Sequence, residues 1–184
     1  MTCTHRSVGM RQRLVLGLAL IALSLAASLA AQARCWTMVG SDGTVDEMDL
    51  QEYAASANTM GIRSDLSNAV VQIRYNIVAV EDVFGGEAKD LRVRLADNGA
   101  DSRVIVRLEQ MNIASGVRTT LATLDSDHFP PSSVAQARSI PFGCFAPEFD
   151  FDANVYFVEA TLEKRTRAGN PLIRAIQICG NTAC

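Results

Sequence analysis

Histidine is nearly absent from this chain, and aromatic residues are few. The 184 residues include two histidines, one tryptophan and three tyrosines. Only His128 lies beyond the N-terminal segment, so a Ser-His-Asp triad has one histidine to draw on. Its flanking residues Asp125, Ser126 and Asp127 are neighbours in sequence, and adjacent residues do not converge on a substrate as a triad does. We interpret His128 as a polar loop residue.

The motifs of common nucleotide and hydrolase sites are missing as well. The sequence has no G-x-S-x-G, no G-x-x-x-x-G-K-[ST] and no G-x-G-x-x-G pattern. Gly85-Gly86 therefore predicts a turn. The chain has no basic run, and its formal net charge is −3, which argues against nucleic acid or anionic lipid as a partner. No catalytic residue and no cofactor site is predicted.

The first 33 residues have the pattern of a secretory signal peptide. Three arginines at positions 6–13 precede an apolar run over 14–31, and the Ala-Gln-Ala sequence ending at Ala33 suits a signal peptidase. We expect cleavage after Ala33 and a single exported domain over 34–184, periplasmic or extracellular, with no membrane partner. An uncleaved anchor is the alternative, because the apolar run is at the short edge of a spanning helix. Removing this segment takes three of 17 basic residues and none of the 20 acidic ones, which leaves a charge of −6.

Cysteine usage agrees with export. Cys35, Cys144, Cys179 and Cys184 follow the signal segment and allow three pairings. We expect two disulfides, as in oxidising compartments, because a zinc site would lack any C-x-x-C pair. The favoured pairing joins Cys144 to Cys179, closing a loop of about 36 residues worth about 4 kcal/mol, and Cys35 to Cys184. The alternative joins Cys179 to Cys184 and Cys35 to Cys144.

Hydrophobic periodicity predicts a mostly β protein. Apolar residues alternate with polar ones in short runs separated by turn signals, which is typical of an antiparallel β-sandwich of about seven to eight strands, stapled by the disulfides. The expected strands span 34–39, 69–79, 91–95, 103–112, 117–124, 140–145, 154–162 and 172–179. Thr44 and Glu47 fit a capping box, so 44–61 is predicted to be one short N-terminal helix.

Two connections between the strands are candidates for surface contacts. The basic segment Lys164–Pro171 holds Gly169-Asn170-Pro171 and is expected to join 154–162 and 172–179 as a hairpin. The segment Asp125–Ser139 is polar and contains Pro130-Pro131, so we expect a loop that crosses between sheets. Loops on a rigid sandwich often carry the binding residues.

Five arginines alternate with apolar residues on the predicted strands, namely Arg74, Arg92, Arg94, Arg107 and Arg118. They form a basic groove if all project from one sheet. The interpretation we favour places each on the solvent face of a half-buried strand, paired across strands with acidic residues.

Acidic residues near Asp150 suggest two further sites. Asp150, Asp152 and Asn154 match the start of a D-x-D-x-N calcium loop, but Val155 and Thr161 replace its glycine and its final glutamate. A glycoside hydrolase needs two carboxylates at a set separation, which Glu148, Asp150, Asp152 and Glu159 could supply.

The leading hypothesis from the sequence is an exported, non-enzymatic binding or accessory domain that contacts a protein or glycan partner. A glycan-directed hydrolase using acidic residues near Asp150 is one alternative. A calcium-stabilised adhesion module, with calcium as its only cofactor, is the other.

Overall fold

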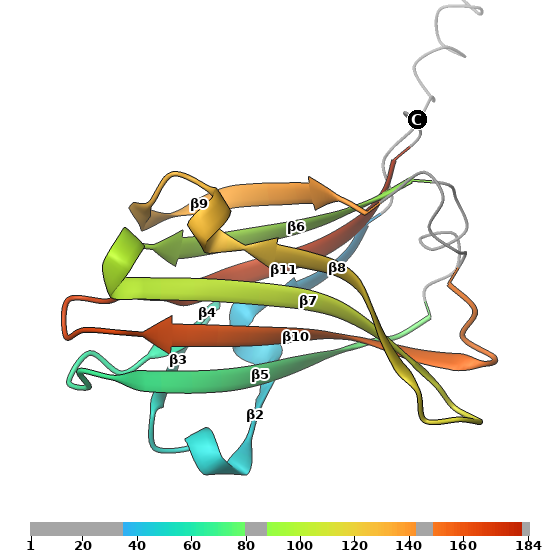
Figure 1. Cartoon of the computed structure of the whole chain (residues 1–184), viewed down its shortest axis with the longest axis horizontal. Helices are drawn as coiled ribbons and strands as arrows, with labels where there is room; N and C mark the ends of the chain where they lie inside the picture. Colours follow the sequence, from blue (N-terminus) through green and yellow to red (C-terminus); the bar gives the residue numbers. More distant parts are fainter. Residues whose placement is uncertain (1–34, 80–87, 143–148, 182–184) are drawn as a thin grey trace, which may run out of the picture. The chain divides into compact units, whose positions relative to one another are not determined.

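Two antiparallel β-sheets packed face to face make up the domain (Figure 1). The computed structural model describes residues 35–79, 88–142 and 149–181. The predicted signal segment 1–33 and the Gly85-Gly86 turn lie outside these residues. Among the described residues, helical structure is limited to short 3-10 turns, and no helix is long and apolar enough to cross a membrane. The predicted β-sandwich is confirmed.

The strands divide between sheet A and sheet B. Sheet A has the order β3-β4-β11-β6-β9, with β1 also paired to β11, and sheet B has the order β2-β5-β10-β7-β8. Sheet A contains β1 (Cys35–Val39), β3 (Tyr53–Ser56), β4 (Thr59–Ile62), β6 (Ala88–Asp97), β9 (Ser132–Pro141) and β11 (Leu172–Asn181). Sheet B contains β2 (Thr44–Val45), β5 (Ala69–Ile77), β7 (Ser102–Asn112), β8 (Arg118–Asp125) and β10 (Asn154–Lys164). The 3-10 turns are η1 (Gly40–Asp42), η2 (Glu47–Asp49), η3 (Gly99–Asp101) and η4 (Ser126–His128).

The core lies between the sheets because the strands alternate strictly. Along β5, buried and exposed residues alternate from Ala69 to Ile77, so one face enters the core and the other meets solvent. Buried Tyr75 donates its hydroxyl to the Gly40 carbonyl at 2.8 Å and so ties sheet B to the segment after β1. Burial raises the pKa of Tyr75 above its ordinary value. A Cβ at Gly40 would lie 2.1 Å from the Ile173 carbonyl oxygen, so only glycine fits there.

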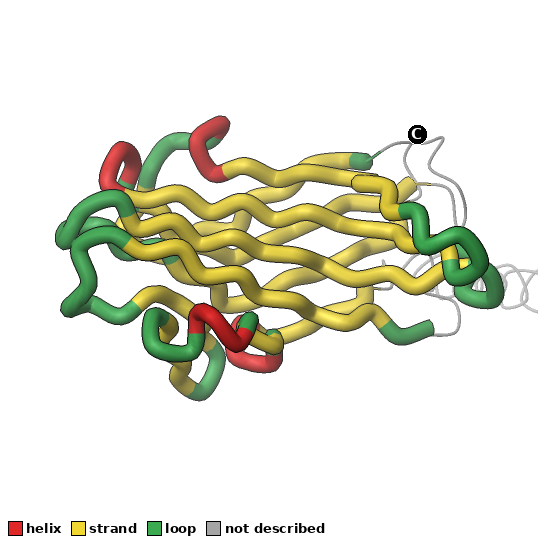
Figure 2. Tube along the Cα trace, turned by 60° about the horizontal axis from the view of Figure 1, so that its bottom comes forward, coloured by secondary structure: helices red, strands yellow, loops and turns green. Residues whose placement is uncertain are grey.

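Most connections cross from one sheet to the other, and two of them meet at what we call the crossover end (residues 97–103 and 163–171). Asn98 Nδ2 donates to the Ala168 carbonyl at 2.8 Å, and the Asn170 amide donates to Asn98 Oδ1 at 3.0 Å. Thr166 Oγ1 donates to Asp101 Oδ1 at 2.6 Å. At the opposite, hairpin end (111–118 and 149–155), the β7–β8 hairpin and the start of β10 project (Figures 1 and 2).

The predicted hairpin of 154–162 with 172–179 is wrong, although both strands exist. The first lies in β10 of sheet B and the second in β11 of sheet A, so Val155 is opposite Met111 rather than Cys179. Segment 165–171 is too long for a tight two-residue hairpin turn and spans the space between the sheets. Alternation in each strand shows which side chains are buried, and it does not show which strand lies alongside.

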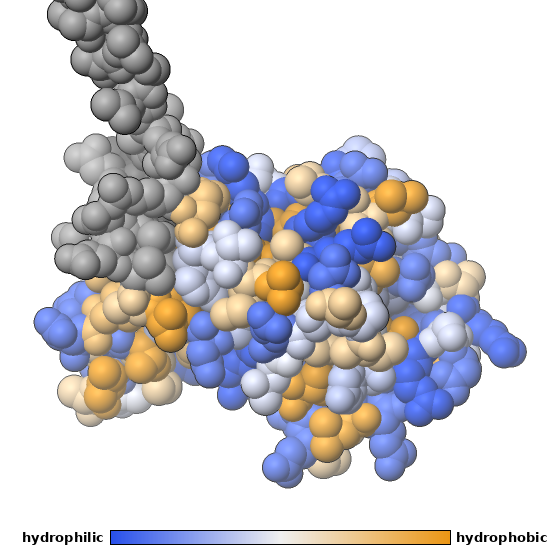
Figure 3. Space-filling model, turned by 180° about the vertical axis from the view of Figure 1, so that it is seen from behind, coloured by the Kyte–Doolittle hydropathy of each residue, from blue (hydrophilic) through white to orange (hydrophobic). Residues whose placement is uncertain are grey.

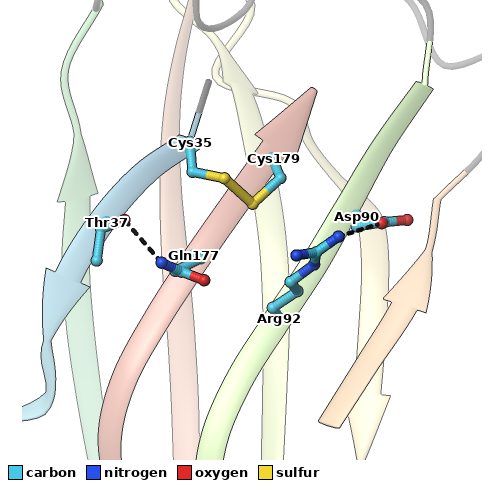
Figure 4. Close-up of a disulfide and its surroundings, with 6 residues drawn as sticks. All are labelled: Cys35, Thr37, Asp90, Arg92, Gln177 and Cys179. Carbon is cyan, nitrogen blue, oxygen red and sulfur yellow. Dashed lines mark hydrogen bonds and ion pairs between the residues drawn. A yellow bond between two sulfur atoms is a disulfide. The ribbon is translucent and has the colours of Figure 1, made fainter. Parts of the chain in front are cut away.

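The favoured disulfide pairing is also wrong. Cys179 bonds to Cys35, its direct partner in the β1–β11 register, across a sequence separation of 144 residues (Figure 4). The predicted Cys144–Cys179 bond depended on the hairpin, and it fails because β10 and β11 belong to different sheets. Cys144 and Cys184 lie outside the described residues.

Residues 44–61 are strands and turns instead of the predicted helix. The capping chemistry occurs two residues later, where Asp46 Oδ1 accepts from the Met48 amide at the start of η2. Tyr53–Ser56 and Thr59–Ile62 then form a hairpin, and Met60 and Gly61 pair with Ile173 and Leu172 of β11. Pairing with a central strand overrides the weak helical pattern.

The predicted loop over Asp125–Ser139 does cross between the sheets, but much of it is a strand. β9 begins at Ser132 and pairs with β6 at the edge of sheet A. Most of its side chains are exposed, so this strand has the polar composition that is typical of a loop. The strand expected over 140–145 is the end of β9 as far as Pro141, and 143–145 lie outside the described residues.

Candidate functional site

The acidic residues near Asp150 form a turn rather than a converging set of ligands. Asp150 Oδ1 accepts from the amides of Asp152 and Ala153 at 3.0 and 3.1 Å. Asn154 Nδ2 donates to the Asp150 carbonyl at 3.1 Å, and Asn154 Oδ1 accepts from Asn112 Nδ2 at 3.3 Å. The described residues contain no group of three or more Asp, Glu, His or Cys arranged to hold a metal ion. The calcium hypothesis stays a prediction.

Aromatic packing explains the character of this turn. Buried Phe149 and half-buried Phe151 pack on Tyr156, with ring centroids 4.4 and 5.0 Å away, as expected for inward-facing residues. The Asp150 amide donates to the Tyr156 hydroxyl at 3.0 Å. Burial raises the pKa of Tyr156 above its ordinary value. Glu148, named for the hydrolase alternative, lies outside the described residues.

The residues around His128 are committed to other contacts. Buried Ser126 Oγ accepts from the Val104 amide at 2.8 Å. Asp125 accepts from Arg103 Nε at 3.0 Å, and this hydrogen bond holds the pKa of Asp125 below its ordinary value. His128 itself is exposed in η4. These contacts agree with a structural interpretation of the segment.

The two predicted contact segments meet at the crossover end. Arg165 Nη2 lies 3.5 Å from Asp127 Oδ2, which joins the 165–171 segment to η4. Neither segment borders the hollow described below.

The five strand arginines are divided between the two sheets. Arg92 and Arg94 belong to β6 of sheet A, whereas Arg74, Arg107 and Arg118 belong to β5, β7 and β8 of sheet B. A groove built from all five is therefore wrong. The favoured interpretation holds for Arg74 and Arg118, which each have an acidic partner on another strand within 4.0 Å. Arg92 pairs instead with Asp90 of its own strand, at 3.1 Å.

The outer face of sheet B brings polar groups of three strands into rows. The strand registers place Arg74–Glu159–Arg107 in one row and Asn76–Phe157–Glu109 in the next, across β5, β10 and β7. Glu159 lies 3.9 Å from Arg74 and 3.3 Å from Arg118, so one carboxylate bridges β5 and β8. Charged residues thus occupy the middle of a sheet face.

A hollow of about 200 Å³ opens on this face where the short β2 ends beside β5. Its polar lining residues are Thr44, Asp46, Gln72, Arg74, Asn76 and Glu159. The Gln72 backbone is used by the η2 segment, because its amide donates to Asp49 Oδ2 at 2.7 Å and its carbonyl accepts from the Asp46 amide at 3.2 Å. These two bonds hold the β2–η2 segment against β5 and so shape the hollow.

Several side chains of the hollow are uncommitted. The side chains of Thr44, Gln72 and Asn76 form no hydrogen bond with any other described residue. Asp46 Oδ1 accepts from the Met48 amide at 3.1 Å, and Glu159 has its arginine partners. The hollow therefore combines anchored charges with free amide and hydroxyl groups.

The sequence predicted part of this site. The alternation of 71–79 placed Gln72, Arg74 and Asn76 on one face, and Glu159 was among the candidate acids. Thr44 and Asp46 were missed because they were assigned to a helix. No local signal shows that β2 lies beside β5, since that pairing involves two residue pairs only.

No protein-family model matches the sequence, and no curated protein is significantly similar to it. Among solved structures, the xylan-binding module CBM15 has a TM-score of 0.44 and 11% identity, over 83% of this chain and 99% of that one. A family 35 carbohydrate-binding module from Clostridium thermocellum has a TM-score of 0.44 and 12% identity, over 81% of this chain and 100% of that one. The insecticidal crystal protein Cry2Aa also has a TM-score of 0.44, with 13% identity, over 79% of this chain and 21% of that one. Equal scores for such different proteins leave function to be argued from this chain's own side chains.

Proposed function

We propose that this chain is an exported, non-catalytic domain that binds a polysaccharide at the hollow on the outer face of sheet B. The observation that carries the proposal is the set of uncommitted side chains of Thr44, Gln72 and Asn76 around the hollow. Sugar hydroxyls both donate and accept hydrogen bonds, and hydroxyl and amide side chains do the same. The anchored charges of Arg74 and Glu159 add stronger donors and acceptors.

The dimensions of the hollow favour a polymer over a small molecule. Its volume of about 200 Å³ is below the roughly 300–1,000 Å³ of common small-molecule sites. A ligand would therefore place one part in the hollow and lie across the exposed sheet face with the rest. Trp36, Tyr75 and Tyr156 are buried in the core and offer no stacking platform. Binding would depend on hydrogen bonds and be weak for each sugar unit.

Binding is favoured over hydrolysis because the carboxylates of the hollow are engaged. Glu159 lies between two arginines, and Asp46 caps η2. The proposal assigns no catalytic residue. The hydrolase centred on Asp150 stays an alternative hypothesis.

The signal-like segment and the disulfide support the proposal of export. The Cys35–Cys179 bond joins adjacent strands of the sandwich, and such bonds persist mainly in oxidising compartments.

Isothermal titration calorimetry against a panel of soluble plant and bacterial polysaccharides tests the proposal. We expect at least one to bind, and the Gln72→Ala, Asn76→Ala double variant to bind it about tenfold more weakly, since each lost hydrogen bond contributes about 0.5–1.5 kcal/mol. Reducing ends released during the titration would instead support the hydrolase alternative.

The matched control is Gln136→Ala on β9, which removes the same amide from an exposed position of sheet A. We expect it to bind as the unsubstituted protein does. Full binding by the double variant, or no binding to any polysaccharide of the panel, would contradict the proposal.

A further inference from the structure

Three arginines surround one phenylalanine and one glutamate on the outer face of sheet B. Arg74 and Arg118 lie over the Phe157 ring, with their guanidinium carbons 5.4 and 5.0 Å from its centroid. Arg107 is the register neighbour of Glu159 on β7. Phe157 is only 9% exposed although its strand position faces outward, which agrees with coverage by the guanidinium groups. We call Arg74, Arg107 and Arg118 the arginine cluster.

Exposure differs between the two signs of charge in this region. The side chains of Arg74 and Arg118 are 57% and 45% exposed, whereas those of Glu159 and Glu109 are 19% and 5% exposed. Thr120 Oγ1 donates to Glu109 Oε1 at 2.8 Å and so holds that carboxylate low on the face. A ligand approaching the sheet therefore meets guanidinium groups, while the carboxylates lie beneath them.

The cluster has more cations than its carboxylates neutralise. Two glutamates, Glu109 and Glu159, face three arginines, and Arg118 takes part in both ion pairs. Arg74 has one ion pair, at 3.9 Å, which is too long for a hydrogen bond. Within the described residues, half-buried Arg107 has no ion pair and no side-chain hydrogen bond. Donors of Arg74 and Arg107 are therefore free for an anion.

This excess is local, because the chain as a whole is acidic at −3. The neighbouring crossover end differs, because its arginines Arg103 and Arg165 are paired with Asp125, Asp127 and Glu163. An anion that fits the arginine cluster must place its charge at one spot on the face.

We propose that the arginine cluster binds the carboxylate of a uronic acid unit, so that the ligand of this domain is an acidic polysaccharide. The proposal rests on the proposed function for the sugar part of the ligand. A guanidinium fork matches the two oxygens of a carboxylate and forms paired, charge-assisted hydrogen bonds. Stacking on Phe157 fixes two of the guanidinium groups before the ligand arrives, which lowers the entropic cost of binding. The adjoining hollow binds the hydroxyl groups of the neighbouring sugar.

Polygalacturonate and its fully methyl-esterified form give the sharpest test, since they share a backbone and differ only at the carboxyl group, which is a charged carboxylate in one and a neutral methyl ester in the other. We expect calorimetry at low salt to show at least tenfold tighter binding of the acid form, as charge-assisted hydrogen bonds are about twice as strong as neutral ones. The preference should shrink as salt is added. Arg107→Gln should reduce the preference to about one, and Arg107→Lys, which keeps the charge and loses the fork, should give an intermediate value.

Arg94→Gln on β6 is the matched control, because Arg94 is exposed on sheet A and its replacement removes the same positive charge. It should leave the preference unchanged, and thermal melts check that each variant is folded. Equal binding of the acid and the ester overturns this inference and leaves the proposed function intact. Tight binding of dextran sulfate without binding of polygalacturonate overturns the carboxylate assignment. Failure to bind any polysaccharide overturns both.

Discussion

At the crossover end of the sandwich, charged side chains join the strands, whereas at the hairpin end a disulfide and a backbone turn do so. Arg103 contacts Asp125, Asp127 and Glu163, and Arg165 contacts the last two as well. Beneath this network, buried Lys164 donates from Nζ to the carbonyls of two residues that precede β5, at 3.0 and 3.2 Å. The crossover end therefore depends on charge.

The hairpin end exposes apolar side chains. Ile113, Val117 and Val155 are 58%, 60% and 40% exposed there. Seen from behind, hydrophobic residues gather on the surface at the lower left, at this end of the sandwich (Figure 3). The Cys35–Cys179 bond fixes β1 to β11 nearby, beside the exposed Arg92–Asp90 pair at 3.1 Å (Figure 4).

The difference shows how the binding face is supported. The outer face of sheet B lies on β5, β10 and β7, which run from one end to the other. Acid should destabilise the crossover end and reductant the hairpin end, so the two ends can be destabilised separately. Four predictions test this separation, beginning with the largest effect.

Replacing both disulfide cysteines, Cys35→Ser with Cys179→Ser, should lower the free energy of unfolding by about 3–5 kcal/mol, because the bond closes a long loop. Urea denaturation measures this loss, and reductant should give the unsubstituted protein a similar value. Hydrogen exchange should rise first in β1 and the end of β11. Equal loss of protection at the crossover end would contradict the separation of the two ends.

Lys164→Met should cost about 2–3 kcal/mol, since the carbonyls of Arg63 and Ser64 lose a charged donor at a partly buried site. Lys164 is only 2% exposed, so water cannot replace its amine without rearrangement. Arg167→Met, at an exposed position nearby, is the control and should change stability by less than about 0.5 kcal/mol. If Lys164→Met is as stable as the control, the hydrogen bonds of the buried amine do not contribute to stability.

Acid should act on the crossover end through Asp125. The hydrogen bond from Arg103 lowers the folded pKa of Asp125, so its contribution is present above the unfolded value of about 3.9 and is lost as pH falls through the folded pKa. Asp125→Asn should therefore cost about 1–2 kcal/mol at pH 7 and flatten the loss of stability between pH 4 and pH 2. Glu47→Gln in exposed η2 is the control and should change stability at pH 7 by less than about 0.5 kcal/mol.

The sequence predicts which face of a strand is buried better than it predicts which strands pair with each other. The alternation in β5 correctly places Val71, Ile73 and Tyr75 inside and Arg74 outside. It cannot predict that β10 lies between β5 and β7 while β11 joins β1, because buried alternating strands present similar apolar faces. The disulfide and the hollow both depend on those pairings.

Short and exposed elements were the other source of error. β2 has two residues and β9 is mostly exposed, so neither has an apolar pattern of its own. Thr44 and Asp46 enter the hollow only because two backbone pairs join β2 to β5. Such contacts are set by the rest of the fold, and a window of local sequence does not contain them.

The smallest expected effect concerns the turn at the hairpin end. Asp150→Ala removes the acceptor of two backbone amides and should cost about 1 kcal/mol, whereas Asp152→Ala at an exposed position should cost less than about 0.5 kcal/mol. The calcium hypothesis predicts a different result: added calcium would raise Tm, a chelator would lower it, and both variants would abolish the difference. Melting curves with calcium and with chelator separate the two. If Tm does not respond to calcium and the variants differ as stated, Asp150 acts by holding the backbone of the turn. A calcium response lost in both variants would instead add a charge-dependent site to the hairpin end, and the contrast between the two ends would no longer hold.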